Sequence, residues 1–157
     1  MAEAQSSGIE LAAFEPAQVD DLILMWRQAF EHGVGIIDPH PIAEQKQYFV
    51  DKVLPGHAVT CALEGTPRGA RLVGFVAASP ESVSQLHVRV GWHRRGIGTR
   101  LLGWAQAQST GSLWLYTFAC NRVARAFYEH HGFIDIAHGF EPEWQLDDVK
   151  YLWTRPA

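Results

Sequence analysis

The segment from residue 86 to residue 102 constrains the fold of this chain more than any other. An apolar, β-prone run passes into a short turn rich in glycine and arginine, and the turn opens directly into an amphipathic helical pattern. Because Gly96 and Gly98 have no Cβ atom, their amides can approach a ligand closely and their backbone can adopt φ > 0. A helix that begins near Gly98 also points its first free N–H groups, and the positive end of its dipole, into the same turn.

Three arginines add positive charge to this turn, namely Arg94, Arg95 and Arg100. Guanidinium groups donate charge-assisted hydrogen bonds in a geometry that suits phosphate oxygens. Two common phosphate-binding patterns are absent from the sequence: it has no Gly-x-x-x-x-Gly-Lys-Ser/Thr, and no Gly-x-Gly-x-x-Gly early in a βαβ unit. The segment therefore predicts a pyrophosphate-binding loop that belongs neither to a P-loop nor to a dinucleotide-binding fold.

Residues 93–98, His-Arg-Arg-Gly-Ile-Gly, resemble the coenzyme A loop of the GNAT acyltransferase superfamily, which reads Gln/Arg-x-x-Gly-x-Gly/Ala after a strand. His93 stands where the family has Gln or Arg, a departure that leaves the main-chain part of the loop intact. A second segment, 121–133, resembles the other GNAT pattern, Asn-x-x-Ala-x-x-Phe/Leu-Tyr-Glu-x-x-Gly-Phe, and follows a buried-strand pattern at 113–118. Since both patterns occur in the family's order with a strand between them, the chain is identified as a member of the GNAT superfamily.

Composition is that of an ordinary globular protein. With 157 residues, 47% of them hydrophobic, we expect a single domain over residues 1–157 in which residues 1–8 form a disordered leader. The net charge of -4 disfavours a nucleic-acid-binding surface and weakly favours cationic acceptors such as amines. Cys61 and Cys120 are too few for a disulfide framework, and no apolar run approaches the ~20 residues of a membrane span. With no secretion signal at the N-terminus, we expect a cytoplasmic protein.

Hydrophobic periodicity and turn residues predict elements in the order β-α-α-β-β-β-α-β-α-β-β. The expected strands are 9–14, 57–63, 71–78, 82–90, 112–118, 133–140 and 149–154, and the expected helices are 16–31, 42–54, 97–109 and 121–131. Gly33 and Gly35 are expected to end the first helix, and Gly132 to follow the last one. This order matches the GNAT fold, so the resemblance implies a mixed α/β class with a central twisted mixed sheet of about seven strands flanked by four helices.

The resemblance also implies where acetyl-CoA binds as a co-substrate. In the family, the fourth strand offers main-chain donors to the acyl oxygen and the pantetheine arm, and here these are the main-chain groups of Val88 and Val90. The expected coenzyme-binding residues are Val88, Val90, His93, Arg94, Arg95, Gly96, Ile97, Gly98, Thr99 and Asn121. A plain core strand explains the two valines equally well, and Asn121 is also a good N-cap residue.

Tyr128 is the expected catalytic residue. The resemblance assigns to it the role of general acid toward the departing thiolate, and Asn121 lies two helical turns away on the same helix face. The alternative is an aromatic side chain that packs beside Phe133 without a chemical role. Arg125 likewise has two interpretations, an approach to the coenzyme or a position on a solvated helix face.

The sequence leaves the general base open. His87 has an ordinary pKa that suits proton transfer, and Glu81 lies just before the fourth strand. The other candidates are His32, Asp38, His40, Glu141 and Glu143, each of which can equally be a solvated polar residue, and Trp144 is a candidate for contact with an acceptor. The histidines show no His-x-x-x-His or His-Glu-x-x-His spacing, so no metal site is expected.

These expectations lead to one leading hypothesis. The chain transfers an acetyl group from acetyl-CoA to the primary amine of a small molecule, by direct attack in a ternary complex. One rival is an acetyltransferase that acts on protein N-termini or lysines, and another is a non-catalytic acyl-CoA sensor or partner-binding module. Nucleic-acid and membrane partners are not expected, whereas a homodimer is a possibility because GNAT domains are often dimers.

Overall fold

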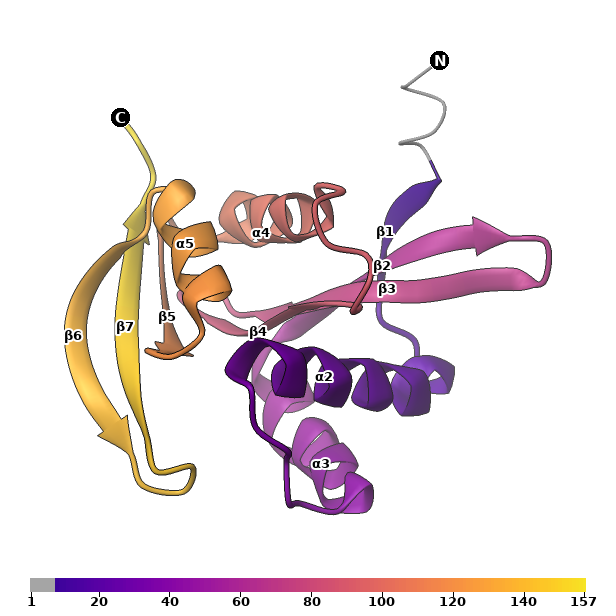
Figure 1. Cartoon of the computed structure of the whole chain (residues 1–157). Coiled ribbons are helices and arrows are strands. Elements are labelled where there is room, and N and C mark those ends of the chain that lie inside the picture. The colour runs from indigo at the N-terminus through magenta and orange to yellow at the C-terminus, as the bar shows by residue number, and fades with distance from the viewer. Residues whose placement is uncertain (1–7) are drawn as a thin grey trace.

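The computed structural model describes residues 8–157, so the expected leader at residues 1–8 lies, except for its last residue, outside the described residues. The elements follow the predicted order (Figure 1). The strands are β1 (Ile9–Ala13), β2 (Ala58–Thr66), β3 (Gly69–Ala78), β4 (Val83–Val88), β5 (Ser112–Phe118), β6 (Ile134–Glu141) and β7 (Leu146–Thr154). The α-helices are α2 (Val19–Val34), α3 (Ile42–Tyr48), α4 (Ile97–Gln108) and α5 (Arg122–His130). Short 3-10 or π turns flank the first two helices: η1 (Pro16–Gln18), η2 (Phe49–Val53) and η3 (Leu54–Gly56).

The seven strands form two antiparallel sheets that share one point of contact. The first sheet has the order β1-β2-β3-β4 and the second the order β5-β7-β6. Within residues 8–157, the pairing between β4 and β5 is limited to one parallel bridge, from Ser82 to Trp114. The mixed α/β fold of seven strands and four helices is thereby confirmed. Beyond this bridge, β4 of the first sheet and β5 of the second sheet separate.

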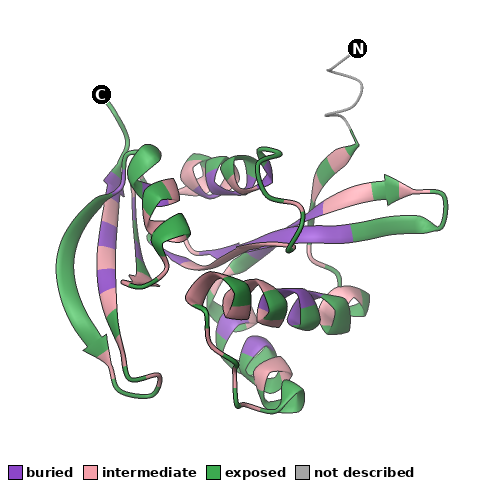
Figure 2. Cartoon of the chain, viewed as in Figure 1, coloured by how far each residue is buried: buried purple, intermediate pink, exposed green. Residues whose placement is uncertain are grey.

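Two apolar cores fill the two faces of the first sheet. On one face, α4, α5 and the second sheet meet around Leu101 and Tyr151, and on the other face α2 and η2 meet around Leu22 and Phe49. Figure 1 shows α4 on one side of the sheet and α2 with α3 on the other. In Figure 2 the buried residues gather where these layers meet, whereas β6 is exposed along almost its whole length.

Several element boundaries differ from the sequence expectation; for example, the last strand, expected at 149–154, begins at Leu146. The first helix continues through Gly33 and ends at Gly35, whose φ is +82°. Gly33 serves close packing instead, because a Cβ there would lie 2.9 Å from Nδ2 of Asn121. The second helix is α-helical only to Tyr48 and continues as the π turn η2. The fourth strand ends at Val88 and not at residue 90, because the chain turns at Gly91, whose φ is +91°.

None of the helices in the described part of the chain is long and apolar enough to cross a membrane.

Candidate active site

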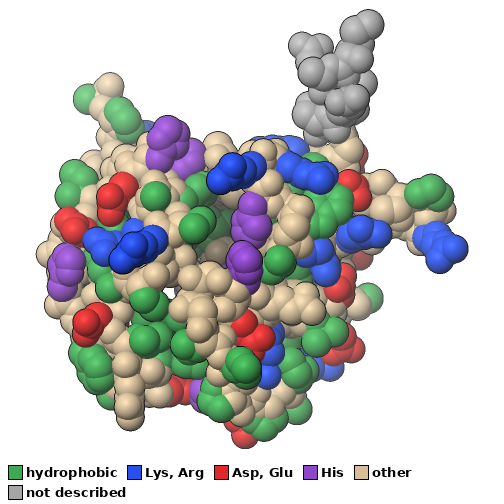
Figure 3. All heavy atoms as spheres, in the orientation of Figure 1, with side chains coloured by type: hydrophobic (Ala, Val, Ile, Leu, Met, Phe, Trp, Pro, Cys, Tyr) green, Lys and Arg blue, Asp and Glu red, His purple; other side chains and the backbone are tan. Residues whose placement is uncertain are grey.

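The gap between β4 and β5 contains a cavity of about 730 Å³. One of its sides reaches Asn121 and Tyr128 of α5, and the other reaches Trp26 and Phe30 of α2. Figure 3 shows this face of the molecule hollowed near its middle. The volume lies within the range of roughly 300–1,000 Å³ that small-molecule sites occupy, so the gap is the candidate active site.

The edge of β4 that faces this gap carries main-chain groups without strand partners. The Arg89 N–H donates to the Val73 carbonyl of β3 at 2.8 Å. Because successive N–H groups of a strand point to opposite edges, the Val88 N–H points away from β3 and toward β5. Val88 therefore has the expected donor position. Val90 lies beyond the strand with a side chain 40% exposed, so its expected place in the fourth strand is wrong.

The turn after β4 has the backbone conformation of an anion-binding loop. Gly96 has a φ of +76° and is the N-cap residue of α4. The first main-chain bond of the helix runs from the Arg100 N–H to the Gly96 carbonyl at 3.0 Å. The N–H groups of residues 97–99 thus have no main-chain acceptor within residues 8–157 and point out of the helix start. The buried side chain of Ile97 anchors this helix start to the core.

Gly98 is required for the contact between α4 and α5. A Cβ at this position would lie 3.3 Å from the ring of Phe127 and 3.7 Å from the side chain of Val88. At the same place, Thr99 Oγ1 and His131 Nε2 lie 3.1 Å apart and connect the two helices. The start of α4 is therefore held against both β4 and α5.

The charged side chains of the loop are partly engaged by the protein itself. The guanidinium of Arg95 lies 4.4 Å from the centre of the Trp92 ring, and Arg100 Nη1 donates to the Ile9 carbonyl at 2.7 Å. Arg94 is exposed and forms no ion pair in the part of the chain that the structure describes. Figure 3 shows basic side chains around the rim of the hollow, whereas no lysine or arginine of residues 8–157 lines the cavity itself.

His93 adds no charge to this rim at neutral pH. Its ring stacks on that of His32 of α2, with ring centres 6.1 Å apart. Burial lowers the pKa of His93, and the neighbouring His32 lowers it further. His93 therefore supplies an uncharged ring where the family has Gln or Arg.

Both ends of α5 are capped. Asn121 Oδ1 accepts the Ala124 N–H at 3.2 Å, so the N-cap role of Asn121 is confirmed. At the other end, the Phe133 N–H donates to the Tyr128 carbonyl and the Gly132 N–H to the Glu129 carbonyl, which is a Schellman motif. These caps fix the direction in which Tyr128 leaves the helix.

Tyr128 combines burial with access to the cavity. Its side chain is 7% exposed, its ring packs 5.4 Å from that of Phe133, and it lines the cavity. Its hydroxyl forms no hydrogen bond within residues 8–157. Because burial raises the pKa of Tyr128, the hydroxyl stays protonated near neutral pH and can donate to a group that enters the cavity.

His87 lines the same cavity, where its Nε2 lies 3.0 Å from Gln85 Oε1 and its ring packs against aromatic rings. Its ring centre lies 5.9 Å from that of Trp26 and 5.6 Å from that of Phe75. Burial lowers the pKa of His87 to about 4, so the expectation that its pKa suits proton transfer is wrong. Glu81 is exposed and does not line the cavity.

Arg125 is held away from the cavity. Its Nε donates to the Tyr151 hydroxyl at 3.0 Å, and this hydroxyl donates to Glu129 Oε2 at 2.5 Å. Arg125 therefore ties α5 to the second sheet, a role that neither interpretation from the sequence included.

The structure adds two carboxylates that the sequence analysis did not single out, Glu44 and Asp148. Both line the cavity beside the expected Asp38, His40 and Trp144. Asp148 reaches it because it pairs with Phe118 of β5 on one side and Gly139 of β6 on the other. The alternation of β7 around the buried Val149 was the available signal, since it places residue 148 on the face opposite the core.

Among residues 8–157, no group of three or more His, Cys, Asp or Glu side chains is arranged to hold a metal ion.

Comparisons with known proteins agree with this geometry. A family model described as an acetyltransferase (GNAT) domain matches residues 55–135. No curated protein sequence matches the chain. The structure of PaiA N-acetyltransferase from Thermoplasma acidophilum in complex with coenzyme A has a TM-score of 0.73 and 17% identity, and the match covers 93% of this chain and 98% of that chain.

Two further structures show the same similarity. NAA60 of Arabidopsis thaliana in complex with a bisubstrate analogue has a TM-score of 0.73 and 18% identity, over 94% of this chain and 99% of that chain. The apo form of YjaB from Escherichia coli has a TM-score of 0.74 and 17% identity, over 94% of this chain and 99% of that chain. At such low identities the structural similarity shows the fold alone.

Proposed function

The chain belongs to the GNAT acetyltransferase family, and from this premise we propose that it transfers an acetyl group from acetyl-CoA to the primary amine of a small molecule. The cavity between β4 and β5 carries this proposal. It brings the Tyr128 hydroxyl to the same gap that the Val88 N–H faces, next to the N–H groups at the start of α4 that have no main-chain acceptor within residues 8–157.

The coenzyme lies between the start of α4 and α5, next to the part of the cavity that Asn121 and Tyr128 line. Acetyl-CoA supplies the activated acetyl group, and the N–H groups of residues 97–99 donate to its pyrophosphate. The positive φ of Gly96 lets the chain turn into the helix with these groups exposed. The exposed Arg94 adds a charge-assisted donor, and Asn121 lies where it can contact the pantetheine arm while it caps α5.

Val88 and Tyr128 perform the transfer. As the amine attacks the thioester carbon, negative charge develops on the carbonyl oxygen, and the Val88 N–H donates to it. The C–S bond then breaks while the new C–N bond is kept, and Tyr128 donates its proton to the departing thiolate. The nitrogen of the new amide loses one proton, and reprotonation of the Tyr128 oxygen restores its hydroxyl. Burial raises the pKa of Tyr128, so the hydroxyl is protonated when the thiolate forms.

Loss of the proton from the acceptor does not need a residue of the chain. With a pKa of about 4, His87 is too weak a base to take a proton from an ammonium group near neutral pH. We therefore assign deprotonation of the acceptor to bulk water before binding, and we expect the rate to rise with pH toward the pKa of the free amine.

Two contacts across the acceptor side support a small molecule over a peptide. Loop 35–41 meets the β6–β7 turn where His40 Nε2 lies 3.2 Å from Glu143 Oε1. Nearby, the rings of Phe30 and Trp144 lie 4.9 Å apart. A peptide that crossed this side would have to separate these contacts, whereas a small amine fits inside them.

Cys61 and Cys120 are both unpaired, which supports a cytoplasmic location for the enzyme.

Turnover tests the proposal directly. We would follow thiol release from acetyl-CoA over a panel of primary amines and of peptides with free N-termini or lysines. The expected result is acetylation of at least one small amine at a higher kcat/KM than any peptide. Preference for a peptide would favour the first rival, and binding of acetyl-CoA with no turnover would favour the sensor.

A further inference from the structure

The side of the cavity that faces α2 and α3 is acidic. Five carboxylates line it, from loop 35–41, from α3 and from the β6–β7 hairpin: Asp38, Glu44, Glu141, Glu143 and Asp148. No lysine or arginine of residues 8–157 lines the cavity, and its two histidines are His40 and His87. With its pKa lowered to about 4, His87 is uncharged near neutral pH. The potential on this side therefore favours cations.

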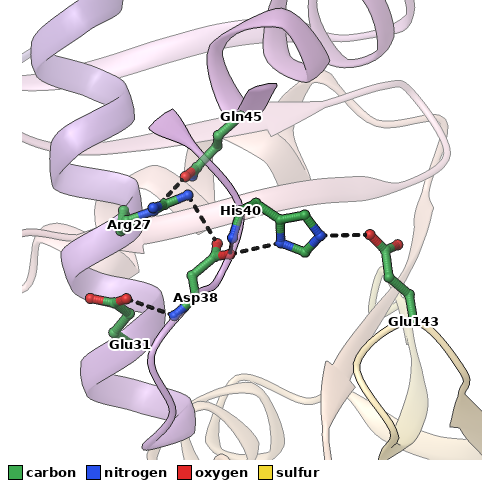
Figure 4. A network of polar contacts seen from close by, with 6 residues as sticks. All are labelled: Arg27, Glu31, Asp38, His40, Gln45 and Glu143. Carbon is green, nitrogen blue, oxygen red and sulfur yellow. Dashed lines mark hydrogen bonds and ion pairs between the residues drawn. The ribbon is translucent and has the colours of Figure 1, made fainter. Parts of the chain in front are cut away.

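Two of these carboxylates already have partners (Figure 4). His40 Nδ1 lies 2.7 Å from Asp38 Oδ1, and its Nε2 lies 3.2 Å from Glu143 Oε1. Arg27 Nη2 lies 3.5 Å from Asp38 Oδ2. The hydrogen bond that His40 donates to Asp38 raises the pKa of His40, and the charges of Asp38, Glu143 and Glu44 act in the same direction. Asp38 and Glu143 are thus committed to holding His40 between the two walls.

The other three carboxylates, Glu44, Glu141 and Asp148, form no ion pair within residues 8–157. Glu141 pairs with Leu146 across the hairpin, and Asp148 lies two residues farther along β7. The two acidic residues are therefore diagonal neighbours on one sheet face, with backbones about 7–8 Å apart. Like charges at this spacing repel each other, and a cation between them would remove the repulsion.

Aromatic rings complete the environment of these carboxylates. Phe118 stands directly opposite Asp148 in the sheet, and the Trp144 ring lies 6.5 Å from the Phe118 ring. Gly139 leaves room for the carboxylate, since a Cβ there would lie 2.9 Å from Asp148 Oδ1. Carboxylates beside aromatic faces are the surroundings that bind an ammonium group.

A second polar group of the same cavity also has no partner. Tyr128 is 7% exposed, its hydroxyl forms no hydrogen bond within residues 8–157, and its ring lies 6.3 Å from that of Tyr151. Asp148 is three residues from Tyr151 in β7 and points to the other face, so about 10 Å of strand separates them. Because Tyr128 and Asp148 line the same cavity, a ligand that reaches both needs a polar group toward each of them.

We propose that the acceptor is an aliphatic amine with a second ammonium group, and that Glu44, Glu141 and Asp148 bind this distal ammonium. The inference rests on the proposed acetyltransferase function, because that function places the reacting amine beside Tyr128. Glu141 Oε2 also accepts the Glu143 N–H at 2.7 Å and so shapes the turn, which leaves Glu44 and Asp148 as the residues to vary.

Two acceptors of equal chain length isolate the effect of the distal charge. At saturating acetyl-CoA, we expect diaminohexane to have a kcat/KM at least tenfold above that of hexylamine. The double variant Glu44→Gln, Asp148→Asn should lower kcat/KM for diaminohexane to the level of hexylamine. Asp147→Asn is the matched control, because residue 147 is the adjacent exposed carboxylate on the other face of β7 and does not line the cavity, so the preference should persist.

The outcomes separate this inference from the proposed function. Turnover of both acceptors with equal kcat/KM overturns the distal-ammonium site and leaves the acetyltransferase standing. If neither acceptor is turned over, we would measure the rise in Tm that each amine causes in the presence of coenzyme A, which shows whether the distal-ammonium site binds. If diaminohexane raises Tm more than hexylamine does, and this difference disappears in the double variant but persists in Asp147→Asn, the distal-ammonium site exists without the transferase activity. Equal rises in Tm with the two amines would contradict the site.

Discussion

The two sides of the cavity are built in opposite ways. The coenzyme side extends from Asn121 and Tyr128, which line the cavity, to the turn after β4 and the start of α4, which lie next to it and offer main-chain N–H groups. The acceptor side comes from loop 35–41, α3 and the β6–β7 hairpin, which are distant in the sequence, and it offers carboxylates and aromatic rings. Backbone shape therefore determines what binds on the first side, and side-chain identity determines what binds on the second.

The largest expected effect concerns His87 on β4, at the boundary between the two sides. Its pKa is about 4 in the folded protein against 6.5 for the free group. Between these two pH values, His87 is therefore protonated in the unfolded chain and neutral in the folded chain. Stability is unaffected above pH 6.5 and falls as the pH drops from there to about 4, by up to about 3 kcal/mol.

Denaturant unfolding between pH 7 and pH 4 checks this prediction. The free energy of unfolding of His87→Gln should fall less steeply over this interval than that of the wild type. Parallel curves would show that His87 titrates normally, and would restore it as a candidate base on the acceptor side.

Tyr128→Phe has the next largest expected effect. The phenyl ring keeps the packing against Phe133, while the proton for the thiolate is lost. We expect kcat to fall about 100-fold or more, with the Kd for acetyl-CoA within about twofold of the wild type. Steady-state kinetics across pH measure this, and turnover equal to the wild type at every pH would exclude the role of general acid.

Gly96→Val tests the claim that backbone shape decides binding on the coenzyme side. A β-branched residue at a φ of +76° is strained, so the turn has to change its conformation. We expect the Kd for acetyl-CoA to rise about tenfold or more although no side-chain contact is removed. An unchanged Kd would mean that side chains, such as Arg94, bind the coenzyme instead.

Gly103→Ala is the matched control in the same helix and has the smallest effect. Position 103 is exposed in α4, and a Cβ there meets nothing within 4 Å. The alanine should raise the free energy of unfolding by about 1 kcal/mol, measured by denaturant unfolding, and leave the Kd for acetyl-CoA unchanged. Weaker acetyl-CoA binding by Gly103→Ala would show that any substitution in α4 disturbs the loop. The Gly96→Val result would then no longer test the backbone conformation of the turn.

The difference between the two sides also explains how much the sequence could predict. Gly96, Gly132 and the cap at Asn121 are local features, because neighbouring residues determine a turn or a helix end, and the structure has them as expected. The position of Val90 was wrong because a strand ends where its pairing with β3 ends, and no local pattern shows that.

The acceptor side depends on contacts between distant segments. Asp148 reaches the cavity through the register of three strands, and Glu44 reaches it through the packing of α3. The low pKa of His87 arises from rings on α2 and β3. These properties follow only when the sheets and helices have been placed, whereas the coenzyme loop follows from a few consecutive residues.

Binding of acetyl-CoA at the start of α4 is the step on which the proposed chemistry depends. A calorimetric titration of the wild type and of Gly96→Val with acetyl-CoA, with NADH as the comparator, measures it. We predict micromolar binding at one site in the wild type, weaker binding in the variant and no binding of NADH. Absence of acetyl-CoA binding to the wild type would contradict the coenzyme site, and with it the assignment of acetyl transfer to this cavity.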